Sequence, residues 1–218
     1  ITAPHGMVLN PEPHCVELIY AGQNVAVTET ATSFENERQK VEISLVKTIE
    51  QNECFGIGNN GEMKNISFGL FAAEEIVSAS GTSIPANGLV EIISLNEDGT
   101  AKIKTDLPFG SYYVQELATD SHYMLSNTKY PVTFGYAGQD TAVVKIAVND
   151  GNAVENKLIY GSVSGKKVEE DGNALGGALI GLFRTDDGEF TKENALMTTT
   201  SAEDGSFSFE SIPYGTWY

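Results

Sequence analysis

The sequence has 218 residues, a length that suits one large domain or two small ones. Its 13 Lys and Arg against 30 Asp and Glu give a formal net charge of −17. Because such an acidic surface repels phosphate backbones and anionic lipid headgroups, we expect no nucleic-acid partner and no binding to membrane surfaces. Hydrophobic residues make up 41% of the chain, which is enough for a packed core. No apolar run is long enough for a membrane-spanning helix, so we expect no membrane insertion.

Short segments in which apolar and polar residues alternate recur along the whole chain. Asn-Gly and Asp-Gly pairs such as Asp98-Gly99 stand between them, and they favour tight turns because Gly tolerates a positive φ. No extended window shows a 3.6-residue apolar period. The sequence therefore predicts an all-β fold, a sandwich or an open barrel of antiparallel type. The clearest predicted strands are residues 41–47, 100–104, 141–148 and 206–209.

Several segments of the sequence occur twice. The run Phe68-Gly-Leu-Phe71 corresponds to 180–183, and the Pro- and Tyr-containing run 107–113 corresponds to 212–218. Toward the N-terminus, Tyr20-Ala-Gly-Gln23 corresponds to Tyr136-Ala-Gly-Gln139. Asn36 precedes Lys47 by the same number of residues as Asn156 precedes Lys167. This equal spacing sets the register of the repeat.

The repeat divides the chain unequally. Residues 39–158 hold one complete copy, residues 1–38 match only its C-terminal part, and residues 159–218 match only its N-terminal part. Laid end to end as 159–218 followed by 1–38, the partial pieces read as one further unit that lacks a few residues at the join. The counterpart of Glu116 is among those missing residues. Since the chain begins with Ile1, we expect it to be a piece of a longer protein.

The repeated motifs resemble those of Cna-B domains, also called SpaA-like or prealbumin-like domains, of Gram-positive surface adhesins and pilins. The resemblance rests on Lys47, the Gly-Leu-Phe run at 68–71, the segment from Pro108 to Glu116, and the closing Glu155-Asn156. The family's Ala-Pro-x-Gly turn appears as Ala3-Pro4-His5-Gly6, whereas the complete copy departs from it with Thr119-Asp120-Ser121-His122. The resemblance implies tandem prealbumin/Ig-like β-sandwiches in an extracellular, wall-anchored protein whose anchor lies outside this sequence.

The resemblance also implies an autocatalytic amide cross-link between a Lys on the first strand and an Asn on the last, assisted by a buried Glu. By position these residues are Lys47, Asn156 and Glu116. Burial disfavours charged forms, so it lowers the pKa of a Lys, which becomes nucleophilic, and raises the pKa of a Glu, which can then carry protons. Periodicity alone allows a plainer interpretation, in which Lys47 is a solvated strand-end charge and Asn156 a turn residue.

The partial pieces allow two interpretations. In Cna-B domains the first and last strands are expected to lie side by side and parallel, so the pieces emerge at opposite poles and cannot complete each other within one chain. Either the chain is cut from a tandem array of neighbouring domains, or the C-terminal piece of one molecule takes up the N-terminal piece of the next. In that head-to-tail association, Lys167 and Asn36 form a second cross-link, and its Glu comes from residues outside this sequence.

Three classes of function remain open. A structural stalk or pilus-type module is the first, and it is no turnover enzyme because each Lys-Asn reaction happens once. An adhesive module for a host protein or glycan requires an exposed aromatic or polar groove outside the repeat positions. A hydrolase requires catalytic carboxylates that converge in a cleft.

The remaining candidate groups point to no cofactor and no metal. The three His and two Cys lack zinc-site spacing, and acidic turns such as 96–98 lack the loop length of an EF-hand. Cys15 and Cys54 are not followed by Gln, as a Cys-Gln thioester would need, and we interpret them as thiols buried in strands.

Overall fold

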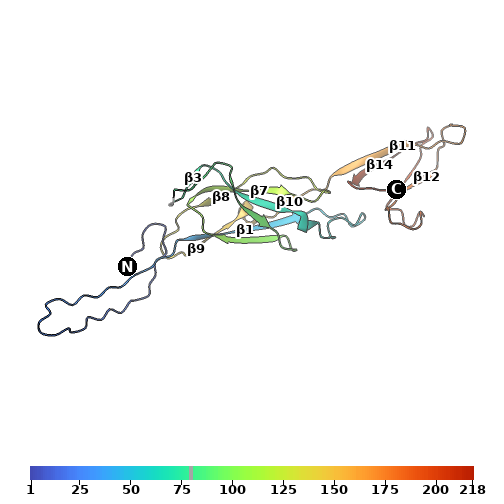
Figure 1. The fold of residues 1–218 in the computed structure, drawn as a ribbon. Coiled ribbons are helices and arrows are strands. Elements are labelled where there is room, and N and C mark those ends of the chain that lie inside the picture. Colours follow the sequence, from blue (N-terminus) through green and yellow to red (C-terminus); the bar gives the residue numbers. More distant parts are fainter. Residues whose placement is uncertain (79–80) are drawn as a thin grey trace.

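The structure is a computed structural model that describes residues 1–78 and 81–218. It forms an elongated molecule with the two termini at opposite ends (Figure 1). Within the described residues, no helix is long and apolar enough to cross a membrane. The strands are β1 (Lys40–Ile49), β2 (Ser67–Ala72), β3 (Ile76–Val77), β4 (Ser83–Ile84), β5 (Leu89–Ser94), β6 (Thr100–Thr105), β7 (Gly110–Ala118), β8 (Tyr130–Phe134), β9 (Val143–Ala147), β10 (Val154–Asn156), β11 (Tyr160–Lys166), β12 (Leu179–Leu182), β13 (Met197–Thr200) and β14 (Ser206–Pro213), with 3-10 turns η1 (Glu62–Asn65) and η2 (Val148–Gly151).

Residues 40–156 form a two-layer β-sandwich, here called the central sandwich. One sheet has the order β10-β1-β6, with β9 also paired to β1, and the other has the order β5-β2-β7-β8. Alternate residues of β1 face the opposite sheet, so Val41, Ile43 and Leu45 are buried. They share one core with side chains such as Phe68 and Val114 of the second sheet. The all-β sandwich expected from the alternation is confirmed.

The first strand of the sandwich lies beside the last two. β1 pairs in parallel with β9 through Lys40–Ser44 and with β10 through Lys47–Ile49. The turn η2 separates β9 from β10, and Asn149 and Asp150 there have φ values of 54° and 53°. The expected parallel contact between first and last strands is confirmed, and it makes the two ends of the sandwich leave at opposite poles (Figure 1).

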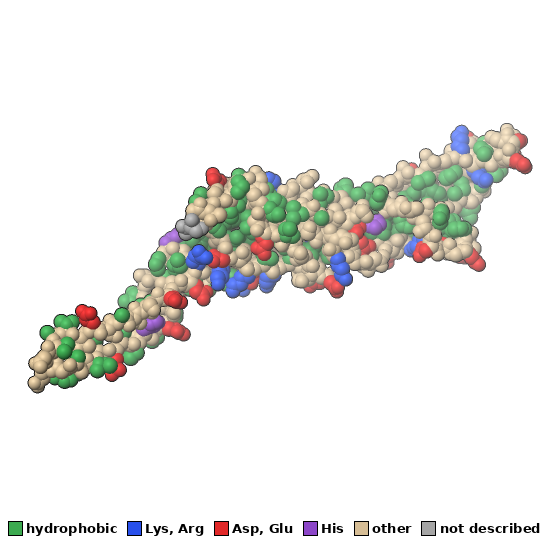
Figure 2. Space-filling model, viewed as in Figure 1, with side chains coloured by type: hydrophobic (Ala, Val, Ile, Leu, Met, Phe, Trp, Pro, Cys, Tyr) green, Lys and Arg blue, Asp and Glu red, His purple; other side chains and the backbone are tan. Residues whose placement is uncertain are grey.

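The residues before β1 form an extended segment that we call the N-terminal arm (residues 10–36). All of its residues are described and none belongs to a strand, because an extended backbone forms a strand only where its N–H and C=O groups pair with a neighbour. At the base of the arm, the Val8 N–H donates to the Glu37 carbonyl at 2.8 Å, and the Leu9 N–H donates to the Gln139 carbonyl at 2.8 Å. Apolar side chains are exposed along the arm (Figure 2): Val16, Leu18, Ile19, Tyr20, Val25, Val27 and Phe34.

Residues 159–218, the C-terminal unit, form two small antiparallel sheets, β11-β14 and β12-β13. Leu182, Phe209 and Ile212 of this unit are buried together with Phe55 and Tyr123 of the central sandwich, in a second hydrophobic core. The C-terminal unit is therefore packed against the end of the central sandwich rather than joined to it by a free linker.

The repeat seen in the sequence is accompanied by repeated backbone contacts. The Lys47 N–H donates to the Gly99 carbonyl at 2.8 Å, and the Lys167 N–H donates to the Gly205 carbonyl at 2.8 Å. Phe71 pairs with Tyr113 across β2 and β7, and residues 183 and 218 exchange two backbone hydrogen bonds at the corresponding place. The C-terminal unit thus reproduces contacts of the first part of the central sandwich.

The start of the chain reproduces contacts of the last part of the sandwich in the same way. Met7 forms an isolated bridge with Arg38, and Tyr123 forms one with Leu158. The turns before both bridges close with the same hydrogen bond, from residue 7 to residue 4 and from residue 123 to residue 120, each at 3.0 Å. The departure from the Ala-Pro-x-Gly turn therefore leaves this turn's backbone bond in place.

The expectation of strand-buried cysteines was wrong. Cys15 and Cys54 are both free and exposed. Cys15 lies in the N-terminal arm, and Cys54 lies in the turn that follows β1, where its thiol donates to the Leu196 carbonyl at 3.4 Å. Neither residue stands in an alternating segment, which is why no sheet face covers it.

Candidate functional site

Lys47 lies inside the central sandwich. It continues the inward-facing positions of Val41, Ile43 and Leu45 along β1, and its side chain is 0% exposed. The plainer interpretation of Lys47 as a solvated strand-end charge is therefore wrong. Its Nζ donates to two backbone carbonyls, that of Thr48 at 2.8 Å and that of Val154 at 3.1 Å.

Glu116 reaches the same place from the other sheet. Tyr112, Val114 and Glu116 are buried at alternate positions of β7, and the Glu116 side chain is 1% exposed. Its Oε1 lies 4.0 Å from the Lys47 Nζ. Its Oε2 accepts a hydrogen bond from the Ser126 backbone N–H at 2.8 Å, which fixes the orientation of the carboxylate.

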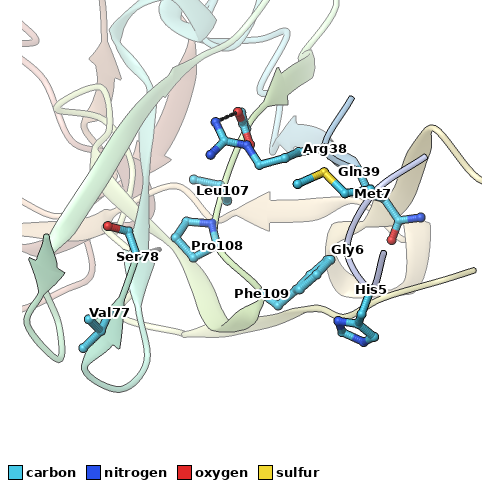
Figure 3. A pocket seen from close by; sticks show the side chains of 11 residues that line it. His5, Gly6, Met7, Arg38, Gln39, Val77, Ser78, Leu107, Pro108 and Phe109 are labelled. Atoms are coloured by element: carbon cyan, nitrogen blue, oxygen red, sulfur yellow. Dashed lines mark hydrogen bonds and ion pairs between the residues drawn. The ribbon is translucent and has the colours of Figure 1, made fainter. Parts of the chain in front are cut away.

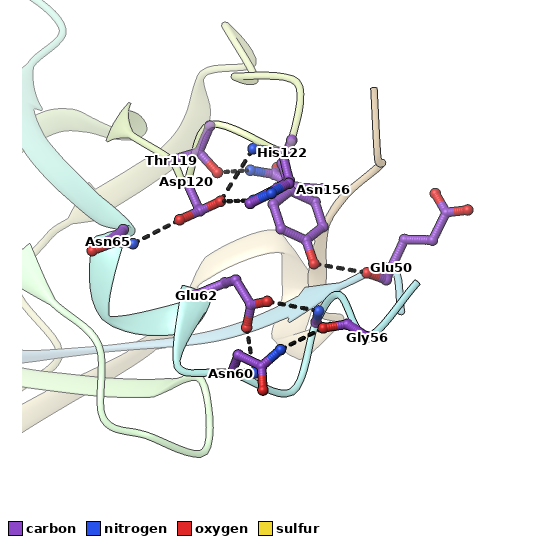
Figure 4. Close-up of polar contacts among 11 residues, drawn as sticks. Glu50, Gly56, Asn60, Glu62, Asn65, Thr119, Asp120, His122 and Asn156 are labelled. Carbon is purple, nitrogen blue, oxygen red and sulfur yellow. Dashed lines mark hydrogen bonds and ion pairs between the residues drawn. The ribbon is translucent and has the colours of Figure 1, made fainter. Parts of the chain in front are cut away.

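Asn156 completes the cluster from β10. It faces inward two residues after the buried Val154, and the β1–β10 register places Val154 opposite Lys47. Its Nδ2 donates to Glu116 Oε1 at 2.7 Å. It also donates to the Thr119 hydroxyl at 2.8 Å (Figure 4). Its Oδ1 is buried and has no hydrogen-bond partner among the described residues. Three side chains far apart in the sequence thus meet in one buried pocket.

The electrostatics of this cluster favour an amine without charge. Burial lowers the pKa of Lys47 to about 8, because the ammonium loses its hydration, although the charges of Glu116 and Glu155 oppose this shift. A neutral amine has two N–H bonds and one lone pair. Since the carbonyls of Thr48 and Val154 accept two N–H bonds, the lone pair is left free for reaction.

The second pair of candidate residues, Asn36 and Lys167, does not meet. Asn36 is at the base of the N-terminal arm, and its Oδ1 accepts from the Asn10 N–H at 3.3 Å. Lys167 follows β11 in the C-terminal unit, at the other end of the molecule. Both side chains are exposed. A bond between them within one chain is excluded by this separation, as expected from the opposite poles.

One residue of the cluster escaped the sequence analysis. Thr119 was noted only as part of a turn that departs from the Ala-Pro-x-Gly pattern, yet its hydroxyl contacts the Asn156 amide. The signal was present in the sequence, because Thr119 stands where the repeat has Ala3. A turn residue could be linked to Asn156 only once the fold had brought the β7–β8 loop over β10.

A cleft of about 580 Å³ lies where the start of the chain meets the central sandwich (Figure 3). The cleft is lined by His5, Met7, Phe109 and the ion pair of Arg38 and Asp106, among others. An adhesive module requires a groove outside the repeat positions. Because Phe109 belongs to the repeated run 107–113, this cleft does not meet that requirement.

No group of three or more His, Cys, Asp or Glu side chains that could hold a metal ion occurs in residues 1–78 and 81–218. Glu62 is a buried carboxylate, but its two oxygens accept hydrogen bonds from the backbone N–H groups of Gly58 and Asn60, at 2.9 and 2.7 Å (Figure 4). This carboxylate therefore has a structural role in the loop after β1.

The two-sheet architecture, with a parallel pair formed by the first and last strands, defines a prealbumin-like β-sandwich. The sequence profile of the SpaA prealbumin-like fold domain matches residues 40–152 and again 161–218. These ranges cover most of the chain, which belongs to this family. The comparison with curated proteins gave no match.

The comparison with solved structures gives matches at low sequence identity. The Bacillus anthracis TIE protein has a TM-score of 0.63 and 20% identity, and the match covers 100% of this chain and 34% of that one. The chain thus spans about a third of the length of that protein. A C-terminal fragment of the pilus adhesin SpaC from Lactobacillus rhamnosus GG has a TM-score of 0.44 and 13% identity, over 83% of this chain and 73% of the fragment. BcpA, the major pilin subunit of Bacillus cereus, has a TM-score of 0.31 and 12% identity, over 82% of this chain and 87% of its own.

Proposed function

We propose that this chain is a structural module of a Gram-positive cell-surface stalk or pilus-type protein, stabilised by an amide cross-link between Lys47 and Asn156. The observation that carries the proposal is the convergence of Lys47, Glu116 and Asn156 in one buried pocket between the first and last strands of the sandwich. The motifs shared with Cna-B domains of surface adhesins and pilins support the extracellular, wall-attached setting.

The reaction balances with the groups in the pocket. Lys47 first passes a proton to Glu116, which leaves a neutral amine and a carboxylic acid. The Nζ lone pair then forms a bond to Cγ of Asn156, and the bond between Cγ and Nδ2 breaks. Glu116 gives its proton to Nδ2 and takes one from Nζ, so ammonia leaves and Glu116 ends as the acid. The adjacent strands remove most of the entropy of encounter that makes amide exchange slow in solution.

The position of this bond suits a protein that carries tension. Force on the chain ends pulls on β1 and β10, which leave the sandwich at opposite poles. A covalent bond between these strands shortens the path of the force and leaves the rest of the sandwich unloaded. It also restricts the unfolded chain, which in the entropy model of loop closure contributes on the order of 4 kcal/mol to the free energy of unfolding.

Intact-mass spectrometry of the purified chain tests the proposal. We expect a mass lower than the theoretical value by one ammonia, and the full mass after Lys47→Ala or Glu116→Ala. Lys104→Ala on β6 and Glu155→Ala on β10 are matched controls because both side chains are exposed, and they keep the deficit. Fragmentation locates the bond between the peptides that contain Lys47 and Asn156. The theoretical mass for the unaltered chain would falsify the cross-link.

The ends of the molecule favour a second step, the head-to-tail association of copies. Exposed apolar side chains run along the N-terminal arm, and others, among them Tyr160, Val163 and Leu179, are exposed on the C-terminal unit. The arm repeats the segment that in the central sandwich pairs with β7 and β1, so the arm of one copy can complete the C-terminal unit of another. Asn36 and Lys167 are then the residues for a bond between molecules.

Mixing two variants tests this association. A chain with Asn36→Ala keeps Lys167, a chain with Lys167→Ala keeps Asn36, and their mixture can form one joined pair. We expect multimers of the unaltered chain in gel filtration at high concentration, and denaturant-resistant dimers only when a chain that supplies the counterpart of Glu116 is added. A monomer at every concentration rules out the association and leaves the bond between Lys47 and Asn156 untouched.

A further inference from the structure

The hydrogen bonds of the reacting amide are distributed unevenly between its two ends. Both N–H bonds of Asn156 Nδ2 are held, one by Glu116 and one by the Thr119 hydroxyl, whereas the buried Oδ1 has no partner among the described residues. A site that stabilises negative charge on the carbonyl oxygen aims donors at that oxygen. This pocket instead gathers its polar groups around the nitrogen that departs.

The charge on Nδ2 changes during the proposed reaction. In the amide, the nitrogen lone pair is delocalised into the carbonyl, and the N–H groups are neutral donors. When Nζ bonds to Cγ, this delocalisation ends and Nδ2 accepts the proton of Glu116, so it becomes positively charged before the Cγ–Nδ2 bond breaks. A hydrogen bond from a charged donor is roughly twice as strong as one from a neutral donor. An acceptor already in place on Nδ2 therefore stabilises the transition state more than the ground state.

We propose that the Thr119 hydroxyl is a second catalytic group of the cross-linking reaction, which accepts a hydrogen bond from Nδ2 of Asn156 and stabilises the departing ammonia. This inference rests on the proposed cross-link and assigns the barrier to departure of the leaving group. Glu116 cannot fill both roles, because the oxygen that delivers the proton to Nδ2 is the one that accepts its N–H in the resting state.

The position of Thr119 also suits release of the product. Lys47 and Glu116 are almost fully buried, whereas Thr119 is only partly buried and lies at the edge of the pocket, on the turn after β7. Ammonia that leaves Nδ2 on the side of Thr119 moves toward solvent and away from the new amide. In the repeat, Ala3 stands at this position and offers no hydroxyl.

The rate of ammonia loss after synthesis tests this inference. The full chain is made by cell-free translation with a short label pulse, samples are quenched in acid, and intact mass is followed with time. Thr119→Val keeps the shape of the side chain without the hydroxyl, Thr119→Ala copies the repeat position, and Thr119→Ser keeps the hydroxyl. We expect Thr119→Val and Thr119→Ala to slow the reaction by about 10- to 100-fold, which corresponds to the free energy of one hydrogen bond to a charged group. Thr119→Ser is expected to keep most of the rate.

A purely structural role of Thr119 predicts a different pattern. The same three substitutions are placed in the Lys47→Ala chain, which cannot cross-link, and their urea unfolding midpoints are compared. If the role is structural, the loss of cross-linking rate follows the loss of stability. If the role is catalytic, Thr119→Ser cross-links fast and Thr119→Val slowly even when their unfolding midpoints are equal. An unaltered chain that cross-links no faster than Thr119→Val overturns the inference alone. An unaltered chain that loses no ammonia overturns the cross-link as well.

Discussion

At the scale of single residues, the proposed cross-linking reaction depends on one proton shared by Lys47 and Glu116. The two side chains are 0% and 1% exposed, and Nζ lies 4.0 Å from Oε1, so a small approach of the two atoms brings them within hydrogen-bond distance for proton transfer. The reactive form has the amine neutral and the carboxyl protonated. This form carries the same total charge as the ion pair, so the two are in equilibrium at any pH at which the pair holds one proton.

The pH dependence of the cross-linking rate follows from this shared proton. With the pKa of Lys47 lowered to about 8 by burial, the amine has lost its proton above that pH and has none to pass to Glu116 for the departing nitrogen. We expect a rate that is flat just below pH 8 and falls about tenfold per pH unit above it. The pulse-labelled chain, diluted into buffers from pH 6 to 10, gives the profile. A rate that instead rises to a plateau above pH 8 contradicts the role of Glu116 as an acid.

At the scale of the elements, the turn between β5 and β6 holds β1 in position. Gly99 has φ 78°, and a Cβ on it would lie 2.2 Å from the carbonyl oxygen of Lys47. This close approach lets the Gly99 carbonyl accept the Lys47 N–H at 2.8 Å. Gly205 repeats the arrangement against Lys167, with φ 78° and 2.4 Å. The Asp-Gly pairs at 98–99 and 204–205 are therefore required both by the turn and by the neighbouring strand.

Replacing Gly99 separates these two requirements. Gly99→Ala places a methyl group against backbone that cannot move aside, so we expect the free energy of unfolding to fall by about 3 kcal/mol, with a smaller cross-linked fraction because Lys47 is displaced. Gly61→Ala is the control: its φ is 90°, but nothing lies within 4 Å of its Cβ position. We expect Gly61→Ala to lower the free energy of unfolding by about 1 kcal/mol, because only the left-handed backbone is strained. Urea unfolding followed by circular dichroism gives the free energy of unfolding of both variants. An equal decrease in the two variants would rule out an effect of the contact with Lys47.

At the scale of the whole molecule, the loop after β1 joins the central sandwich to the C-terminal unit. The Glu50 carboxylate accepts from the Leu158 N–H at 3.1 Å and from the Tyr160 hydroxyl at 2.9 Å. Phe55 of the same loop packs edge-on against Trp217, with ring centres 4.9 Å apart. The loop is longer than its counterpart between Lys167 and residue 180. The contacts of Glu50 and Phe55 in this loop with the C-terminal unit are here called the brace, and they hold the two units together.

The fluorescence of Trp217 reports on this brace, because it is the single tryptophan of the chain. Phe55→Ala removes the ring that covers it, so we expect emission at longer wavelength, stronger quenching by iodide, and an unchanged mass deficit. Phe34→Ala is the matched control, since Phe34 lies in the N-terminal arm and is 67% exposed. If Phe55→Ala leaves the emission and the quenching unchanged, the contact does not shield the junction.

The sequence by itself determined the fold class and the repeat. Alternation at 41–47 and Asp-Gly turns are local signals, and they require a two-faced sheet whatever the rest of the chain does. The equal spacing from Asn36 to Lys47 and from Asn156 to Lys167 is likewise a property of the sequence, and the backbone hydrogen bond of Lys47 to Gly99 recurs as that of Lys167 to Gly205.

The tertiary structure alone decided which polar residues are buried together. Lys47 shares its alternating face with apolar neighbours, but periodicity cannot say whether the end of a strand is covered; the opposite sheet and β10 cover it. The contact of Thr119 with Asn156 joins residues 37 positions apart, and the brace at Phe55 and Trp217 joins the two ends of a long segment. Local patterns specify which face of an element is apolar, whereas the environment of a charge depends on elements distant in the sequence. Periodicity alone therefore could not distinguish a solvated Lys47 from a buried one.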